Sequence, residues 1–578
     1  MNRYISYIFA VALVFAVAFI SCKKGTSTVK VTGITLNKST ISIPVGGSEQ
    51  LMVTEILPSN AAEKGVTWSS DNTARAMVDP LGKVLVPNTA AAGTVNITAT
   101  AKDGSDVKAT CMVTVTSEPD TPPPPDDDDG NPNWLPTERQ LTNTAVETAG
   151  TLDISGSGAA TVTITIDKST TYQDIWGFGA SIVGPATNFR RDLSTANQNK
   201  VFDLLFLNEG DNVGLTVSRL NINPQIWNVQ ANPYRWEQDD DQVWFAQQVY
   251  KRYPTPITAS PWTPPAWMKQ NNSVNDGYFR FEYTDKLAQW LYDWAHHYRD
   301  HHNLNVKWLS IQNEPNAEVT WNGCRYNPAE LEGVLLTTID YFRSKNSPVW
   351  VGGPECGNDE DAQKYLDAWS ANTRAQMDWI AHHGYKCVNN PPGDRDFRKY
   401  GKPCLMTEQC SGSGNNEVDM DTDGLRWAFH IRRALSRDEK GFLFWQIVRN
   451  SPSQSLLGIR NNQDFYEVYK RVYVFAQYSR FIRPGYIVVG ATCVPASNEN
   501  NYCVTAAKHP TTGNTSVIIA NKQAYDITVI IKGLSGSRIG GRITNEQNDF
   551  VATKDMTATG SDFTVKIPAK SVVSIAEK

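Results

Sequence analysis

The segment WLSIQNEPN (residues 308–316) is a short apolar run that stops at an acid followed by a proline. Proline has no backbone N–H, so a strand ends where it occurs, and Glu314 is thereby placed at a strand end. The same pattern recurs in LMTEQCSG (405–412), where apolar residues lead to Glu408 before a Gly-Ser loop. A carboxylate at a strand end adds little to a hydrophobic core, so both acids are candidates for chemistry.

Short apolar strands alternate with helical segments around these two acids. Two segments have apolar residues at i, i+3, i+4 and i+7, which indicates amphipathic helices, namely TDKLAQWLYDWAHHYRDH (284–301) and PAELEGVLLTTIDYFRSK (328–345). The strand candidates are VGLTVSRL, PITASP, VKWLSIQ, VWVGGP, MDWIAHH, PCLMTE and GFLFWQIV. Alternation over some 300 residues predicts an α/β fold with a parallel sheet, and its length suits a (β/α)8 TIM barrel over residues 165–480.

The spacing of the two acids predicts that they face each other. Glu314 and Glu408 are 94 residues apart, which is three units at about 31 residues per βα unit. Glu314 would then end strand 4 and Glu408 strand 7, on opposite sides of the barrel mouth. Glu355 in VWVGGPEC also follows a strand, but it lies one step from Glu314 and is interpreted as a flanking residue. Two opposed carboxyls suit the cleavage of an acetal, one as proton donor and the other as nucleophile or base.

The N-terminus predicts export and a lipid anchor. The segment MNRYISYIFAVALVFAVAFISC has one arginine, an apolar stretch and then a small residue before Cys22. These features are typical of a lipoprotein signal peptide over residues 1–21, with Cys22 lipidated; a bare anchor helix would have a similar composition. We expect an exported bacterial lipoprotein on a membrane, at the outer membrane or cell surface.

The other blocks predict β-sandwiches. Residues 30–116 contain short alternating strands separated by turns, which favours a small antiparallel sandwich. The order of ITLN, a Gly-Gly turn, VTWSSDN, LGKV and GTVNITAT in this block resembles the bacterial Ig-like group 2 domain, which implies a spacer or adhesive unit. Prolines and aspartates at 117–133 predict a stiff linker. Residues 134–164 and 481–578 are expected to form a side β-sandwich, in which Cys493 and Cys503 could close a hairpin disulfide.

Five separated motifs in the catalytic block resemble glycoside hydrolase family 30, within a clan of retaining (β/α)8 hydrolases. They are GFGAS (177–181), ASPWTPPAWMK (259–269), IQNEP (311–315), LMTE (405–408) and VYVFAQYSRFIRPGY (472–486). The resemblance implies that Glu314 is the acid/base and Glu408 the nucleophile.

The resemblance also implies roles for further side chains at strand ends. Asn313 would bind the sugar 2-hydroxyl and Trp445 would offer an aromatic platform. His383 and Tyr385 would orient the nucleophile, and Arg219 would bond to it and lower its pKa. Trp262 and Trp267 would stack on the sugar, with core packing as the alternative for each.

The substrate is less constrained than the chemistry. EVTWNGCRYNPAELEGVL (318–335) resembles the xylanase branch of the family, so a (glucurono)xylan polysaccharide is the expected partner. Arg449 would bind a glucuronate carboxylate, or it is a solvated loop charge. Glutamine, cysteine, serine and glycine after Glu408 partly resemble β-1,6-glucanases, and a glucosylceramidase-like glycosidase is a further alternative. A non-catalytic surface carbohydrate-binding protein is the alternative of another class.

Composition and motifs indicate few other partners. The net charge is −6 without a long basic run, so nucleic acid is not an expected partner. The cysteines and histidines lack metal-ligand spacing, and two carboxyls with water suffice for the reaction, so no cofactor or metal is expected.

Overall fold

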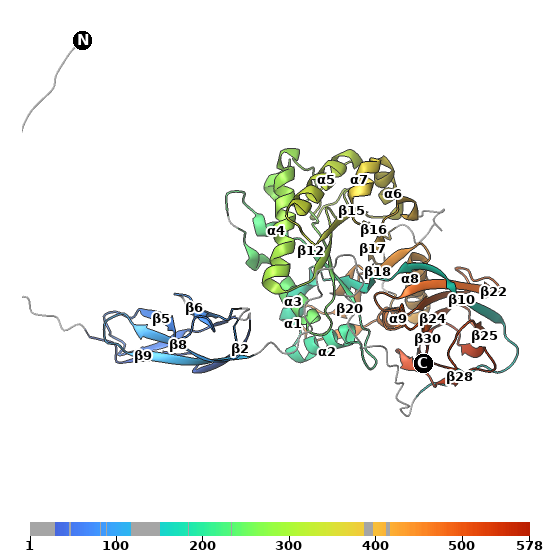
Figure 1. The fold of residues 1–578 in the computed structure, drawn as a ribbon, viewed down its shortest axis with the longest axis horizontal. Helices are drawn as coiled ribbons and strands as arrows, with labels where there is room; N and C mark the ends of the chain where they lie inside the picture. The colour runs from blue at the N-terminus through green and yellow to red at the C-terminus, as the bar shows by residue number, and fades with distance from the viewer. Residues whose placement is uncertain are drawn as a thin grey trace, which may run out of the picture. The chain divides into compact units, whose positions relative to one another are not determined.

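The computed structural model describes residues 29–45, 48–80, 82–87, 90–116, 151–182, 184–232, 234–385, 397–411 and 417–578 (Figure 1). The predicted signal peptide, the lipidation site Cys22, the linker and residues 134–150 lie outside the described residues. The chain divides into two compact units, Met1–Pro123 and Pro124–Lys578. None of the helices in the described ranges is long and apolar enough to cross a membrane.

The first unit is a small β-sandwich, as its alternating sequence predicts. Its strands are β1 (Gly33–Leu36), β2 (Thr40–Pro44), β3 (Ser48–Gln50), β4 (Val53–Leu57), β5 (Val66–Ser70), β6 (Met77–Val78), β7 (Lys83–Leu85), β8 (Gly93–Ala101) and β9 (Lys108–Thr116). Alternate residues of β8 and β9, such as Ile97 and Val113, are fully buried between the layers. The prediction of a purely antiparallel sandwich is wrong at one edge, where β2 pairs with β9 in parallel. The chain enters β2 from β1, which pairs with β4 in another sheet, so no hairpin fixes an antiparallel direction there.

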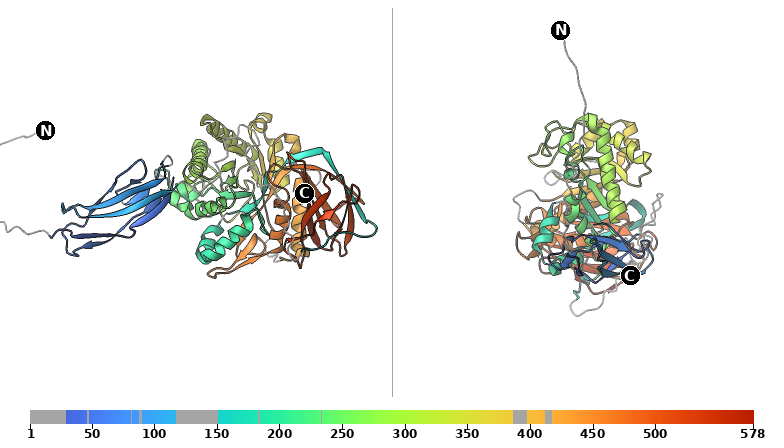
Figure 2. Two further views of the ribbon diagram at one scale, coloured as in Figure 1. Left: turned by 60° about the horizontal axis from the view of Figure 1, so that its bottom comes forward. Right: turned by 90° about the vertical axis from the view of Figure 1, so that its left-hand side faces the viewer.

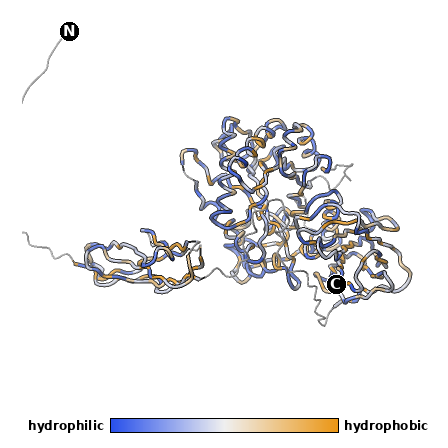
Figure 3. Tube along the Cα trace, viewed as in Figure 1, coloured by the Kyte–Doolittle hydropathy of each residue, from blue (hydrophilic) through white to orange (hydrophobic). Residues whose placement is uncertain are grey.

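The second unit contains the predicted barrel. Eight parallel strands close on themselves in chain order: β11 (Gly177–Ser181), β12 (Val217–Asn221), β13 (Ile257–Ser260), β14 (Val306–Ser310), β15 (Trp350–Cys356), β16 (Ile380–His383), β17 (Cys404–Gln409) and β18 (Glu439–Phe444). These strands are almost wholly buried, which explains their continuous apolar runs. Figure 3 shows hydrophobic and hydrophilic residues mixed along the surrounding elements, as expected of amphipathic segments.

In the described residues, eight α-helices lie between strands of the barrel and a ninth follows its last strand. They are α1 (Pro185–Asp192), α2 (Thr195–Phe206), α3 (Asp240–Tyr250), α4 (Thr284–His302), α5 (Pro328–Ser344), α6 (Asp359–Ala368), α7 (Ala371–Gln376), α8 (Leu425–Leu435) and α9 (Lys470–Ser479). α5 begins with a capping box, in which the Asn327 side chain accepts from the Glu330 backbone and Glu330 reaches back to the Asn327 N–H. Three short strands, β19 (Gln446–Arg449), β20 (Ser455–Ile459) and β21 (Tyr466–Val468), form a small sheet after the barrel.

The side β-sandwich follows the barrel in the chain, and one strand from before the barrel joins it. Its strands are β10 (Val162–Asp174), β22 (Ile487–Val494), β23 (Tyr502–Lys508), β24 (Thr515–Asn521), β25 (Ile527–Lys532), β26 (Arg538–Thr544), β27 (Val551–Ala552), β28 (Met556–Thr557), β29 (Phe563–Ile567) and β30 (Ser571–Glu577). In Figures 1 and 2 the teal β10 lies among the orange and red strands of this sheet. Cys493 and Cys503 are free thiols, so the hairpin disulfide considered from the sequence is not formed.

The predicted start of the barrel at residue 165 is too early. β10 continues to Asp174 and pairs with β22 and β25, and the first barrel strand begins at Gly177. Val162, Ile164 and Ile166 alternate into the core of the sandwich, and this burial commits the whole strand to that sheet.

Candidate active site

Glu314 stands at the mouth of the barrel directly after its fourth strand, β14. Its backbone N–H donates to the Glu355 carbonyl at 3.0 Å, and the Asn313 N–H donates to the Pro261 carbonyl at 2.9 Å. Glu314 and Glu355 have φ of 46° and 54°, in the left-handed region that side chains other than glycine rarely adopt. Strained backbone of this kind is concentrated at functional sites, where the surrounding structure holds it in place.

Glu408 ends the seventh strand, β17, and is 5% exposed. Arg219 Nη1 from β12 donates to its Oε2 at 2.5 Å, and the Tyr385 hydroxyl donates to its Oε1 at 2.8 Å. Each carboxylate oxygen therefore has its own donor, which fixes the orientation of the group and favours its ionised form.

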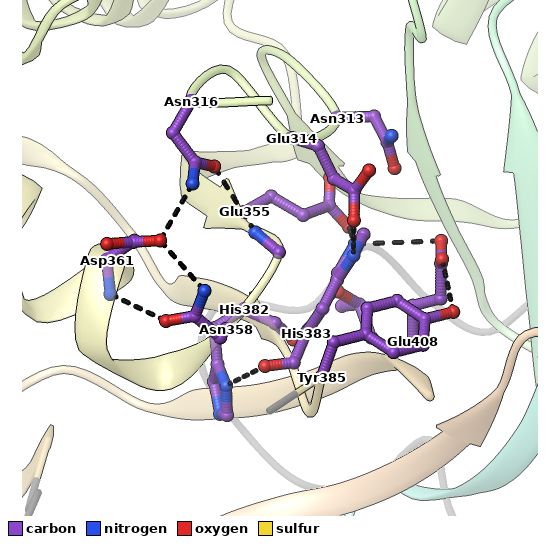
Figure 4. Close-up of polar contacts among 12 residues, drawn as sticks. Asn313, Glu314, Asn316, Glu355, Asn358, Asp361, His382, His383, Tyr385 and Glu408 are labelled. Atoms are coloured by element: carbon purple, nitrogen blue, oxygen red, sulfur yellow. Dashed lines mark hydrogen bonds and ion pairs between the residues drawn. The ribbon is translucent and has the colours of Figure 1, made fainter. Parts of the chain in front are cut away.

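The two acids meet, as their spacing predicts. A carboxylate oxygen of Glu314, a ring nitrogen of His383 and a carboxylate oxygen of Glu408 all lie within 4.8 Å of one another. In Figure 4 both carboxylates point toward the His383 ring, which stands between them. His383 Nδ1 lies 3.1 Å from Glu314 Oε1, and its Nε2 lies 3.6 Å from Glu408 Oε2. The carboxylate oxygens of Glu314 and Glu408 are thus within 4.8 Å of each other. Direct attack by one carboxylate requires a spacing of about 5–5.5 Å, whereas activation of a water requires about 6.5–9.5 Å, so the observed spacing is closer to the first value.

Arg219 is fully buried beneath the acids and joins four strands of the barrel. Beside Glu408 it binds Asn313 Oδ1 at 2.6 Å, Ser260 Oγ at 3.2 Å and Glu355 Oε1 at 3.2 Å. Glu355 lies one strand beyond Glu314, in the flanking position that the sequence indicates. Ser260 was not among the predicted site residues, although its place at the end of β13 is the same signal that identified the acids.

The charges of this cluster shift its pKa values in different directions. Burial raises the pKa of Glu408, and the nearby charges of His383 and Arg219 offset only part of this effect. Burial also raises the pKa of Glu314, but the hydrogen bond and charge of His383, together with Arg219, more than offset it, so that this pKa lies below its ordinary value. Glu355 is buried too, yet Arg219 and His383 lower its pKa to about 2.

His383 carries the proton in this arrangement. Burial by itself would lower its pKa, but the carboxylates of Glu408, Glu314 and Glu355 raise the pKa to about 9. The three acids of the cluster thus face two groups that favour a positive charge, the Arg219 guanidinium and the His383 ring.

The predicted aromatic residues divide into two groups. Trp262 is 7% exposed, and the Arg219 guanidinium lies 4.5 Å from the centre of its ring. The centre of the half-buried Trp445 ring lies 5.6 Å from the centre of the Trp262 ring. Both rings therefore border the carboxylate cluster. Trp267 instead donates its indole N–H to the Trp227 carbonyl at 2.8 Å and packs edge-on against the Trp227 ring. These contacts indicate that Trp267 is a packing residue of the protein core.

Arg449 is exposed in β19, where its Nη1 donates to Gln446 Oε1 at 3.3 Å. The structure does not bring it into the carboxylate cluster.

The same cluster is the group of described residues whose ligand atoms lie close enough to converge on a metal ion. A divalent cation at this position would meet the Arg219 guanidinium, which is already 2.5 Å from Glu408. Two carboxylates with fixed orientations and an arginine that compensates their charge are better suited to acid, base and nucleophile chemistry on a bound substrate.

Comparison with known proteins matches both units. Residues 30–113 match the family model of the bacterial Ig-like domain (group 2). The chain is 24% identical over 450 residues to a glucuronoxylanase of Bacillus subtilis, covering 74% of this chain and 94% of that protein. It is 23% identical over 332 residues to an endo-1,6-β-D-glucanase of Aspergillus fumigatus, covering 50% of this chain and 63% of that protein.

A solved structure shares the fold of the second unit. The catalytic domain of a family 30 xylanase C from Talaromyces cellulolyticus superposes with a TM-score of 0.63 at 22% identity, covering 72% of this chain and all of that one. The chain therefore joins a domain that matches the group 2 bacterial Ig-like model to a (β/α)8 barrel with a side β-sandwich, and this second unit has the fold of the Talaromyces family 30 xylanase.

Proposed function

We propose that this protein is a retaining endo-β-glycanase that hydrolyses internal bonds of a xylan-type polysaccharide. The observation that carries the proposal is the approach of Glu314 and Glu408 to within 4.8 Å across the mouth of the barrel. The similarity to a glucuronoxylanase over most of that protein's length supports xylan as the substrate.

The reaction is a double displacement. Glu408 attacks the anomeric carbon while Glu314 gives a proton to the departing glycosidic oxygen. Glu314 then takes a proton from water, which attacks the same carbon and releases the sugar from Glu408. Arg219 and Tyr385 hold both oxygens of Glu408 in position throughout.

The proton for the first step is shared between Glu314 and His383. His383 Nδ1 and Glu314 Oε1 are 3.1 Å apart; the His383 ring lowers the pKa of Glu314 and the carboxylates raise the pKa of His383, so the imidazole is favoured as the holder of the shared proton. It reaches the leaving oxygen through Glu314. Asn313 accepts from Arg219 with its carbonyl oxygen, so its amide nitrogen is the group that donates to the sugar 2-hydroxyl.

The glucuronate branch is a separate question. A cavity of about 390 Å³ beside the ends of β11 and β12 is lined by acidic residues and amides, including Glu237, Asp239, Asp240 and Asp241. Its one arginine, Arg190, is paired with Asp241 at 2.9 Å. The acidic residues that line this cavity would repel the carboxylate of a uronic acid. We therefore keep exposed Arg449 as the candidate partner for a branch carboxylate.

Product profiling on glucuronoxylan, arabinoxylan and β-1,6-glucan tests the substrate. We expect internal cleavage of both xylans, with short oligosaccharides released early. Cleavage of β-1,6-glucan with intact xylans would favour the glucanase alternative, which the similarity to the Aspergillus enzyme supports. Binding without new reducing ends on every polymer would favour the non-catalytic alternative.

We also propose that the chain is exported and anchored to a membrane through lipidated Cys22, with the Ig-like domain as a spacer. The proposal rests on the N-terminal sequence. Mass spectrometry of the protein from the membrane fraction should show an N-terminus at Cys22 that carries acyl chains. An N-terminus at Met1 would favour an unprocessed anchor helix.

A further inference from the structure

The loop that carries Glu314 also presents an exposed tryptophan. Trp321 lies in the β14–α5 loop (residues 311–327) and is 58% exposed. In the part of the chain that the structure describes, no other ring packs against the Trp321 indole. An indole of this size normally contributes most when buried, so its exposure on a catalytic loop needs a reason.

The loop is rigid although it carries little regular structure. It pairs with the β13–α4 loop (residues 261–283): the Asp276 N–H donates to the Trp321 carbonyl at 3.2 Å, and the Gly323 N–H donates to the Val274 carbonyl at 3.1 Å. The fully buried Lys269 side chain donates to the Gly323 carbonyl at 2.5 Å. These bonds hold the backbone at the Trp321 carbonyl and at Gly323, two residues further on.

An arginine fastens the two loops a second time. Arg325 binds Asp276 at 2.8 Å and Glu318 at 3.2 Å, and its guanidinium lies 4.6 Å from the centre of the Tyr278 ring. One face of Tyr278 is therefore occupied by this cation, whereas Trp321 is held at its backbone and open at its ring. A rigid, uncovered aromatic ring is a preorganised surface for a flat apolar partner.

The topology decides which part of a polymer such a ring would meet. Both loops follow the C-terminal ends of barrel strands, on the face where the carboxylates lie. Under the proposed function, Glu314 protonates the oxygen of the departing sugar, so the leaving segment of the chain lies on the Glu314 side of the cleaved bond. Glu314 and Trp321 belong to the same loop, so we place Trp321 on that side of the site.

We propose that Trp321 is a sugar-binding platform for the leaving-group segment of the polysaccharide, stacking on the apolar face of a pyranose ring. This inference rests on the proposed function, because it takes its direction from the acid role of Glu314. Such a platform would favour the cleavage of internal bonds. A bond near the end of the polysaccharide has too few sugars on its leaving side to reach Trp321.

Kinetics on two substrates test the platform. Trp321→Ala and Trp321→Phe are compared with the wild type on xylan and on a nitrophenyl xylobioside, which has no sugar on the leaving side. We expect the ratio of kcat/KM on xylan to kcat/KM on the xylobioside to fall about tenfold in Trp321→Ala. Trp321→Phe, which keeps a flat ring, should recover most of the ratio.

A matched control uses an exposed aromatic residue far from the barrel mouth in the fold. Tyr525, 61% exposed between β24 and β25 of the side sandwich, is replaced by alanine and should leave the ratio unchanged. An unchanged ratio in Trp321→Ala, or an equal fall in Tyr525→Ala, would overturn the platform. Failure of the wild type on both substrates would instead contradict the proposed function.

Discussion

Glu314 and Glu408 differ in the hydrogen-bond partners of their carboxylate oxygens. Both are close to His383, but only Glu408 receives bonds from Arg219 and Tyr385 on its two oxygens. A carboxylate restrained in this way is suited to attack, and one whose partner is a protonated ring is suited to deliver a proton.

Glu314→Gln tests the acid role. The amide cannot give up a proton, so kcat/KM on xylan is expected to fall about 10³-fold. An aryl glycoside with a good leaving group needs little protonation, so its glycosylation step should be far less affected. Rates on xylan and on a series of aryl glycosides whose leaving groups differ in pKa check this. Exposed Glu282→Gln is the control. Equal losses on both substrates would argue against the acid role.

His383→Gln tests the shared proton through the pH profile. The positive charge of His383 lowers the pKa of both Glu314 and Glu408. Activity requires Glu408 ionised and Glu314 protonated, so the pKa values of these two acids set the two limbs of the profile. Without the cation both pKa values rise, so both limbs of kcat/KM against pH should move to higher pH. Exposed His301→Gln should leave the profile in place; a shift to lower pH in His383→Gln would contradict the account.

At the scale of elements, strand ends were the part of the site that the sequence predicted well. The spacing of Glu314 and Glu408 placed them on strands four and seven, because parallel strands all end at one face and each unit has a similar length. The pairing of β10 with β22 and the parallel pairing of β2 with β9 were not predictable. Alternation shows which face of a strand is buried, but it does not identify the neighbouring strand or its direction.

The resemblance implied the bond from Arg219 to Glu408, but the other long-range bonds of Arg219 could not be predicted from the sequence. Arg219 also contacts Ser260 and Glu355 on two further strands and Asn313 in the loop after β14. Their convergence depends on the register of the closed barrel, which residue patterns do not specify. The same holds for Trp267, whose contacts with Trp227 only the folded loops reveal.

A buried ion pair joins the barrel to the elements that follow it. Arg471 of α9 donates to Asp423 at 2.6 Å, and both side chains are 0% exposed. Arg471 also donates to the carbonyls of Pro452, Ser455 and Glu417. Burial raises the pKa of Asp423, and Arg471 opposes that rise.

Arg471→Met leaves the Asp423 charge buried without its partner. We expect the free energy of unfolding to fall by about 3–5 kcal/mol, measured by urea denaturation. Arg190→Met breaks the exposed pair with Asp241 and should change it by less than about 1 kcal/mol. Similar losses in the two variants would show that burial of the Arg471 pair is not what stabilises this junction.

At the scale of the whole molecule, the residues proposed to act in catalysis all belong to the second compact unit. A protein that begins at residue 124 keeps the complete barrel and side sandwich, because the division between units falls there. We expect its kcat/KM on soluble xylan to remain within about twofold of the full chain, since separate domains fold independently. Measurement of both proteins in one assay checks this, and a large loss would mean that residues 1–123 contribute to the site.

The central claim is that Glu408 forms a covalent bond to the sugar, and trapping that bond tests it most directly. An activated 2-deoxy-2-fluoro xylobioside slows both steps, so the glycosylated protein should accumulate and can be digested for mass spectrometry. We expect one sugar adduct on the peptide that contains Glu408, together with products of retained configuration. An adduct on Glu355 or Glu314, or inverted products without any adduct, would contradict it.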